Sequence, residues 1–318
     1  MKTPARRAAV CGKPIGHSLS PVIHSAGYAA AGLLGWSYTA IECAEAELPD
    51  LLAGLGPEWA GLSLTMPLKE AALALARQAS PVALATGAAN TLVRRDDGTW
   101  YADNTDVPGM IHVLTAAGLT APGATAVGPA AVGPTTGPTA AAAGLTKTGS
   151  DPARLPAGGP ARPLSVTVLG GGGTARAALA AVAQLGAREV TVVTRRPEVR
   201  AELLPAATAL GLTIIGVDWA DAPATFDVDA VISTVPKGAA DHLAAQVTWR
   251  RGTVLFDAIY DPWPTPLAAA ASAHGVPVVS GLDLLLAQAL GQFEHFTGVI
   301  PAPEAAMRAA LTAAASVR

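Results

Sequence analysis

Short apolar runs alternate with stretches of helical spacing along the first hundred residues of the chain. The runs at residues 8–12, 37–43 and 61–67 have the length of buried strands. The stretches that begin at residues 20 and 67 repeat apolar side chains every three or four positions, which is typical of helices. Strands that alternate with helices predict a layered α/β domain.

A second series of the same kind follows farther along the chain. Helical spacing returns from residue 106, and residues 165–169 form an apolar, β-branched run that leads into glycines and an alanine-rich helix pattern. Another β-branched run, residues 189–194, comes after that helix. This order is typical of a doubly wound parallel sheet. We therefore expect two α/β domains with a cleft between them, of which the second is Rossmann-type.

The segment of residues 120–163 interrupts the second series. It is rich in Ala, Gly, Pro and Thr and has almost no large apolar side chains, so it cannot repay the entropy of ordering. A loop of that length without structure is rare inside a compact domain. We therefore predict a disordered insertion in a surface loop, most simply one without a function of its own.

Composition and charge narrow the classes of function. At 318 residues the chain is long enough for two domains, and its net charge of −3 gives no basis for attraction to nucleic acid or an acidic membrane. Two cysteines are too few for a disulfide framework, no secretory signal opens the chain, and no apolar stretch approaches the roughly 20 residues that cross a bilayer. We expect a soluble, cytoplasmic protein that acts on small molecules.

A glycine motif follows the apolar run at residues 165–169. Gly170, Gly172 and Ala175 fill the positions of the G-x-G-x-x-G/A fingerprint of dinucleotide-binding domains. The first glycine permits a tight turn, the second lets the backbone approach a pyrophosphate, and free N–H groups at the helix start face the phosphates. The predicted cofactor-binding segment is Gly170, Gly171, Gly172, Gly173, Thr174 and Ala175.

The residues after the next strand indicate which dinucleotide binds. NAD enzymes usually place a carboxylate there for the ribose hydroxyls, whereas this chain has Thr194, Arg195 and Arg196. Guanidinium groups are good bidentate partners of a 2′-phosphate. The sequence therefore predicts NADP, and the alternative is a pair of solvated surface arginines.

Three polar residues of the first domain are candidates for chemistry. Lys69 lies in the first turn of a predicted helix, where the macrodipole opposes a cation, and such violations often mark functional sites. Asn90 could equally be a turn residue, and Asp106 stands where a helix N-cap would be. Together the three could bind a polyhydroxylated substrate and move a proton.

Two serines stand before the first predicted helix. Ser20 is a good N-cap residue and Pro21 suits the first helical position, but capping does not explain Ser18. The alternative is that both hydroxyls complete an anion site at the helix N-terminus, for instance for a carboxylate. The local sequence leaves both open.

Longer motifs carry a resemblance. The chain closely resembles the shikimate dehydrogenase family along nearly its whole length, with the insertion as the exception. The family pattern G-x-P-I-x-H-S-x-S-P-x-x-H is matched by Gly12, Pro14, Ile15, His17, Ser18, Ser20, Pro21 and His24. The N-V-T-x-P-x-K, G-A-x-N-T, N-T-D, D-x-x-Y-x-P-x-x-T-P-L and G-L-x-M-L-x-x-Q patterns correspond to residues 63–69, 87–91, 104–106, 257–267 and 281–288. The chain departs from the family at Ser63, Ser233 and Leu284, where Asn, Asn and Met are usual.

The resemblance implies an NADP-dependent oxidoreductase that interconverts 3-dehydroshikimate and shikimate in aromatic-precursor biosynthesis. It gives Lys69 the catalytic role with Asp106 as its partner. It assigns the substrate carboxylate to Ser18 and Ser20 and further substrate contacts to Thr65, Asn90, Asp106, Tyr260 and Gln288. It places Ala258 and Gly281 against the nicotinamide half of the cofactor.

The expected organisation follows from these assignments. Residues 1–108 with 283–318 would form the substrate domain, and residues 109–282 the NADP domain. The substrate is a small molecule, and no metal, nucleic acid or membrane partner is expected. A monomer or homodimer is predicted. An enzyme that also acts on quinate, and a non-catalytic shikimate-binding relative, are the alternatives.

Overall fold

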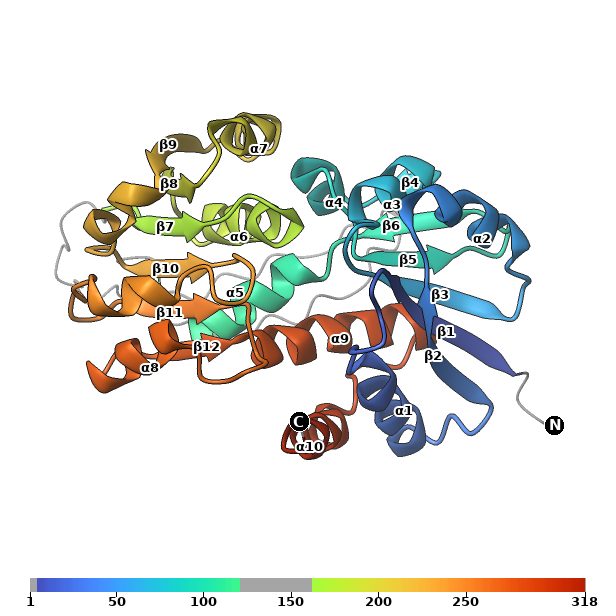
Figure 1. Cartoon of the computed structure of the whole chain (residues 1–318). Coiled ribbons are helices and arrows are strands. Elements are labelled where there is room, and N and C mark those ends of the chain that lie inside the picture. Colours follow the sequence, from blue (N-terminus) through green and yellow to red (C-terminus); the bar gives the residue numbers. More distant parts are fainter. Residues whose placement is uncertain (1–4, 121–161, 318) are drawn as a thin grey trace, which may run out of the picture.

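The computed structural model describes residues 5–120 and 162–317, which form two six-stranded sheets with helices packed on them (Figure 1). Two α/β units are therefore present, as the sequence indicates. In the described part of the chain, no helix is both long enough and apolar enough to cross a membrane. The predicted insertion at residues 120–163 lies, apart from its first and last few residues, outside the described part.

The first sheet is mixed, in the order β2-β1-β3-β5-β6-β4. Strand β1 pairs in parallel with β2 and β3, whereas β5 is antiparallel to both β3 and β6. Its strands are β1 (Arg6–Gly12), β2 (Trp36–Glu42), β3 (Trp59–Leu64), β4 (Gln78–Ala79), β5 (Thr91–Arg94) and β6 (Trp100–Asp103). Its helices are α1 (Ser20–Ala30), η1 (Glu45–Glu47), α2 (Leu48–Gly54), α3 (Lys69–Leu75) and α4 (Pro81–Thr86).

The second sheet is parallel throughout, in the order β12-β11-β10-β7-β8-β9. Its strands are β7 (Val166–Leu169), β8 (Glu189–Thr194), β9 (Thr213–Asp218), β10 (Ala230–Ser233), β11 (Val254–Asp257) and β12 (Val278–Ser280). The helices between them are α6 (Gly173–Gln184), α7 (Pro197–Ala209), η2 (Trp219–Thr225), η3 (Asp241–Ala245) and α8 (Pro266–Ala273). The order reverses between β7 and β10, which is the point where ligands bind in doubly wound folds.

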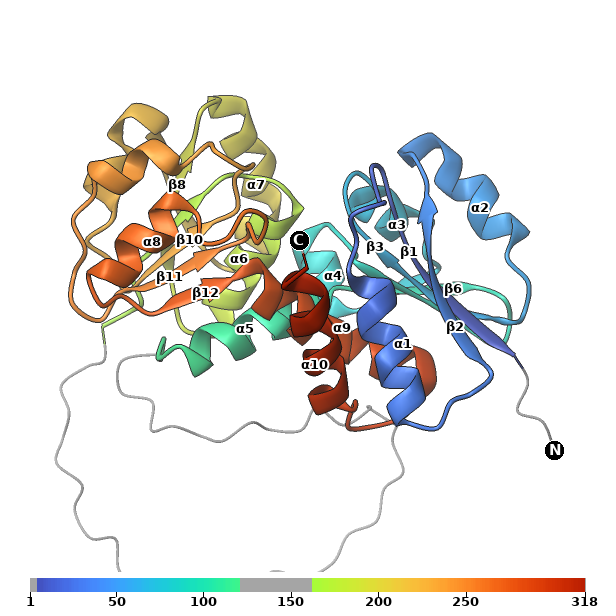
Figure 2. The same cartoon turned by 60° about the horizontal axis from the view of Figure 1, so that its bottom comes forward.

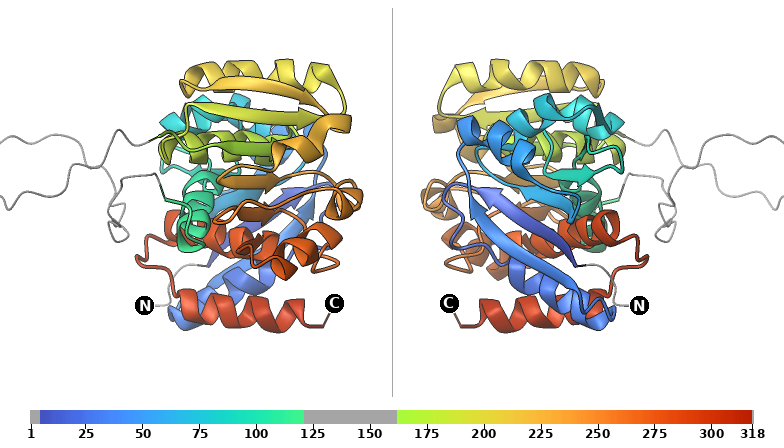
Figure 3. Two further views of the ribbon diagram at one scale, coloured as in Figure 1. Left: turned by 90° about the vertical axis from the view of Figure 1, so that its left-hand side faces the viewer. Right: turned by 90° about the vertical axis from the view of Figure 1, so that its right-hand side faces the viewer.

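Two helices connect the units: α5 (Asp106–Ala116) and α9 (Gly281–Thr297) lie against each other between the sheets (Figures 1 and 2). Helix α9 contributes Leu284 to the core of the second unit and Phe293 to the core of the first. The last helix, α10 (Glu304–Ala315), packs beside α1, as both end views show (Figure 3). Because α9 serves both cores, the domain boundaries at residues 108 and 282 stay predictions.

The structure shows where the helices next to the site begin and how they are capped. The first helix begins at Ser20 itself, and the Oγ of Ser18 accepts the backbone N–H of Ser20 at 3.3 Å. The capping role considered for Ser20 is therefore wrong, because the N-cap residue is Leu19 and no side chain caps this helix. The helix expected from residue 67 begins at Lys69, and α5 begins at Asp106 rather than after it.

Candidate active site

A cavity of about 280 Å³ opens between the two units. It is lined from the first unit, from α9 and from the carboxyl ends of strands in the second unit. The predicted site residues that line it are Ser18, Ser20, Thr65, Lys69, Asn90, Asp106, Thr174, Ala258, Tyr260, Gly281 and Gln288. The structure thus brings the whole predicted substrate set to one place, together with three residues of the predicted cofactor set.

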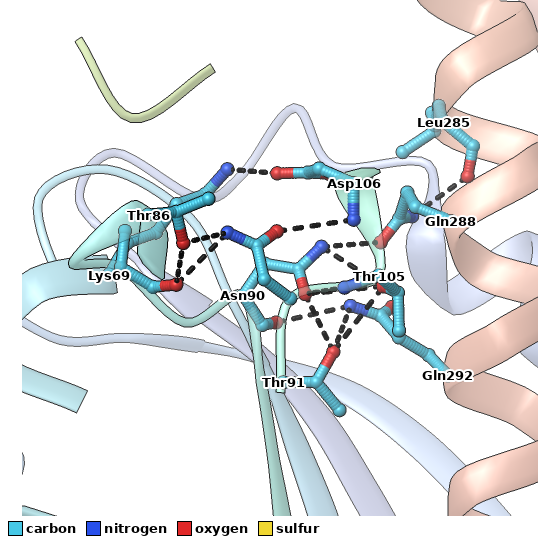
Figure 4. A network of polar contacts seen from close by, with 11 residues as sticks. Lys69, Thr86, Asn90, Thr91, Thr105, Asp106, Leu285, Gln288 and Gln292 are labelled. Atoms are coloured by element: carbon cyan, nitrogen blue, oxygen red, sulfur yellow. Dashed lines mark hydrogen bonds and ion pairs between the residues drawn. The ribbon is translucent and has the colours of Figure 1, made fainter. Parts of the chain in front are cut away.

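A close ion pair lies on the wall of this cavity. The Nζ of Lys69, at the start of α3, donates to Oδ2 of Asp106, at the start of α5, over 2.6 Å (Figure 4). Their side chains are 17% and 9% exposed. The predicted pairing is therefore confirmed, and a partly buried ammonium is held beside the cavity with its charge balanced.

Asn90 holds the backbone of the residue before Asp106. Its Oδ1 accepts hydrogen bonds from the backbone N–H of Thr105 and from the hydroxyl of Thr91, both at 2.8 Å. Its Nδ2 donates to the hydroxyl of Thr105 at 3.0 Å. The side chain is buried, and its hydrogen bonds link the first residue of β5 to the residue before Asp106. Asn90 is therefore more than a turn residue.

Asn104 also holds the backbone at the start of α5. Its Nδ2 donates to the carbonyl of Ala88 at 2.9 Å and to the hydroxyl of Thr86 at 3.2 Å. Its Oδ1 accepts the backbone N–H of Asp106 at 3.3 Å. Because Asn90 binds the N–H of Thr105 and Asn104 binds the N–H of Asp106, the backbone at the start of α5 is held by two buried amides.

Helix α9 supplies two glutamines one turn apart. Gln288 lines the cavity, and its Nε2 donates to the carbonyl of Leu285 at 2.8 Å. Gln292 is only 1% exposed and links α9 to the first sheet. Its Oε1 accepts from Ser63 of β3 at 2.7 Å. Its Nε2 donates to the carbonyl of Asn90, the residue before β5, at 3.1 Å (Figure 4). Sequence reasoning missed Gln292, which sits one helical turn beyond the predicted Gln288.

A buried aromatic pair extends this network beneath the serines. The Tyr38 hydroxyl donates to Ser63 at 2.6 Å, and its ring stacks on that of His24 with 4.1 Å between centroids. Burial raises the pKa of Tyr38 and lowers the pKa of His24 to about 3, so both rings are neutral. Ser63, where the family has Asn, therefore both accepts a hydrogen bond from Tyr38 and donates one to Gln292. Tyr38 was also missed, because it lies in the middle of an ordinary-looking strand.

The glycine segment has the backbone that a pyrophosphate site needs. Gly170 has φ +108°, a conformation that side chains rarely adopt, and the space around Gly172 is open where a Cβ would stand. Gly172 precedes α6 and has no side chain to cap the helix, so the first N–H groups of α6 are left for a ligand. Gly171 packs on Val199 of α7, and Ala175 is fully buried in the core, where it supports the turn without facing a ligand.

The residues after β8 lie on the surface outside this cavity. Arg195 and Arg196 are exposed and can be reached by a cofactor phosphate. Thr194 is buried, and its hydroxyl donates to the carbonyl of Arg196 at 2.9 Å, so it shapes the turn. Where β12 passes into α9, a Cβ on Gly281 would stand 2.0 Å from the carbonyl oxygen of Ala258, so only glycine fits.

No metal-binding cluster is found in residues 5–120 and 162–317, where no three His, Cys, Asp or Glu side chains gather.

Comparison with known proteins agrees with this geometry. Residues 10–92 match the model of the shikimate dehydrogenase substrate binding domain, and residues 281–312 match that of the shikimate 5'-dehydrogenase C-terminal domain. The chain is 34% identical over 304 residues to the shikimate dehydrogenase (NADP(+)) of Caulobacter vibrioides, which covers 94% of this chain and 92% of the relative.

Solved structures are similar over nearly the whole chain. Shikimate dehydrogenase of Mycobacterium tuberculosis has 38% identity and a TM-score of 0.75, covering 97% of this chain and 99% of that one. The Mycobacterium fortuitum enzyme has 42% identity and a TM-score of 0.75, covering 98% and 99%. The Thermus thermophilus enzyme in complex with NADP(H) and shikimate has 27% identity and a TM-score of 0.71, covering 97% and 99%.

Proposed function

The chain belongs to the shikimate dehydrogenase family, and we propose that its cleft carries out the reversible, NADPH-dependent reduction of 3-dehydroshikimate to shikimate through Lys69 and Asp106. The observation that carries the assignment of these residues is the 2.6 Å ion pair on the cavity wall. It places a proton donor and a carboxylate side by side next to a space that accepts a small molecule.

The substrate is held from three sides. The hydroxyls of Ser18 and Ser20 stand at the start of α1 and bind the ring carboxylate, since helix N-termini favour anions. Thr65 follows β3, and Tyr260 and Gln288 reach the cavity from the second unit and from α9. Asp106 accepts a hydrogen bond from a ring hydroxyl, and the Nδ2 of Asn90 donates to another. Serine hydroxyls that can donate to a carboxylate lie at one end of the cavity, and paired polar groups lie at the other. This arrangement fits a hydroxylated cyclic acid.

Charge develops on the ring oxygen when hydride arrives at its carbon. Lys69 stabilises that oxygen and supplies the proton, and in the reverse direction it accepts one. Asp106 orients the ammonium through the 2.6 Å hydrogen bond and accepts a hydrogen bond from a neighbouring substrate hydroxyl. Asn90 and Asn104 hold the backbone that carries Asp106, so the donor reaches the reacting oxygen in a fixed geometry.

The glycine segment and the residues after β8 fit NADP. The reduced cofactor, NADPH, supplies the hydride when it is bound. The open backbone at Gly172 and the uncapped start of α6 accept its pyrophosphate, and the exposed Arg195 and Arg196 accept the 2′-phosphate. Ala258 and Gly281, which line the cavity, would contact the nicotinamide half of NADP.

Initial rates with shikimate and with quinate, each with NADP⁺ and with NAD⁺, test the function. We expect high kcat/KM for shikimate with NADP⁺ alone. Comparable rates with quinate would favour the broader enzyme, and binding of shikimate without turnover would favour a non-catalytic relative.

The organisation around the site is proposed on the same basis. Residues 1–108 with 283–318 form the substrate domain and residues 109–282 the NADP domain, because the serines follow β1 of the first sheet and the glycine segment follows β7 of the second. A cytoplasmic location and a monomeric or homodimeric state stay predictions.

A further inference from the structure

The first turn of the cofactor helix touches the side chain of the candidate catalytic lysine. A Cβ added to Gly173, the first residue of α6, would stand 3.2 Å from Cδ of Lys69. That separation is tighter than ordinary contact, so the stem of the lysine rests directly on the backbone of Gly173. The dinucleotide fingerprint uses Gly170, Gly172 and Ala175, and it does not itself require a glycine at this position.

Arg176 makes a second contact on the same side of α6. It follows Gly173 by three positions, which puts both residues on one helix face. Its Nη2 lies 3.4 Å from Oε1 of Glu70, the residue after Lys69. Its Nη1 lies 3.5 Å from the position of a Cβ on Gly87, at the end of α4, where the helix dipole favours a cation. One side chain thus connects the second unit to α3 and α4 of the first.

The position of Arg176 is unfavourable for the stability of the fold. Its side chain is only 13% exposed, and its Nε is buried without a hydrogen-bond partner in the described part of the chain. A cation in the first turn of a helix is also opposed by the dipole of that helix. Because a buried, incompletely paired guanidinium destabilises a fold, its position indicates a task other than stability.

We propose that the face of α6 formed by Gly173 and Arg176 positions Lys69 for catalysis. Gly173 supports the lysine stem, and Arg176 holds the neighbouring Glu70, so that Nζ keeps its place beside Asp106. The same helix offers its N-terminus to the pyrophosphate. The geometry of the proton donor is therefore tied to the unit that carries the cofactor. This inference rests on the proposed role of Lys69.

The test compares Arg176→Ala with a control arginine in the same unit. Arg250→Ala removes the ion pairs to Asp227 and Asp229, and none of these three residues lines the cavity. We expect Arg176→Ala to lower kcat about tenfold with KM for shikimate nearly unchanged, because a small misplacement of a reacting group is costly. Arg250→Ala should lower the midpoint of thermal unfolding but leave kcat as it is.

Two further variants separate positioning from folding. Arg176→Lys retains a cation at the site and should recover most of kcat, which a merely structural loss would not predict. Glu70→Gln changes a side chain that is 63% exposed, so it should fold normally. It should lower kcat in the same sense as Arg176→Ala, and the double variant should lose less than the product of the two single losses.

Wild-type kcat in both Arg176→Ala and Glu70→Gln would overturn the inference. The outcome is distinct from failure of the proposed function, because Lys69→Ala reports on that function separately. If Lys69→Ala is inactive while Arg176→Ala and Glu70→Gln are fully active, only the positioning by α6 is refuted. If Lys69→Ala retains turnover, the role of the lysine itself is refuted, and the positioning proposal with it.

Discussion

Replacing Gln292 with leucine should lower the free energy of unfolding strongly and change KM for shikimate only a little. The side chain is 1% exposed and makes three hydrogen bonds: it accepts from Ser63 at 2.7 Å and donates to Asn90 O at 3.1 Å and Thr91 Oγ1 at 3.2 Å. At about 1 kcal/mol for each bond, the loss is roughly 3 kcal/mol, part of it the desolvation of groups left unpaired. Leucine is similar in size, so little cavity is created.

Gln288→Leu, one turn earlier on α9, is the matched control. The amide of Gln288 donates to Leu285 O, and its contact with Asn90 is long at 3.5 Å, so we expect a stability loss of about 1 kcal/mol or less. Both glutamines line the cavity, but Gln288 is 7% exposed and Gln292 only 1%, so KM for shikimate should rise more for Gln288→Leu than for Gln292→Leu. Urea unfolding and steady-state kinetics measure both quantities. Equal stability losses in the two variants would refute the assignment of Gln292 as the buried link.

Two further predictions concern the cofactor and pH. Arg195→Ala and Arg196→Ala should each lower kcat/KM with NADPH about tenfold or more, since charge-assisted bonds are worth about 1.5–3 kcal/mol, and leave NADH rates unchanged; equal losses with both cofactors would contradict this. Burial lowers the pKa of His24 from 6.5 to about 3, so the unfolded chain binds a proton between these values that the folded chain does not. The free energy of unfolding, measured by urea titration, should therefore fall by up to roughly 2 kcal/mol between pH 6.5 and pH 5. His24→Phe should abolish that decline. The same decline in the His24→Phe variant would contradict the role given to His24.

The local signals of the sequence predict the elements around the site well. Thr265 caps α8 through the N–H of Ala268 at 3.1 Å, as its place before Pro266 indicates. The positive φ of Gly170 follows from the strand–glycine–helix order. Each of these features depends on a few adjacent residues, so the sequence contains the information needed.

The interior of the site depends on contacts between distant residues. Ser63 and Gln292 are 229 positions apart, and their bond exists because α9 returns from the second unit to pack on the first sheet. The pattern of α9 predicts a buried face but not its partner. Tyr38 and Arg176 were missed for the same reason, since each is ordinary in its own helix or strand and gains its role only across the interface.

The direct test of the central assignment is turnover of Lys69→Ala, measured together with its affinity for shikimate. If Lys69 stabilises and protonates the ring oxygen, kcat should fall by a factor of about 10²–10⁴, while the Kd of shikimate from calorimetry changes far less. Circular dichroism should show the same fold as the wild-type chain. A folded Lys69→Ala protein with half the wild-type kcat would contradict the account.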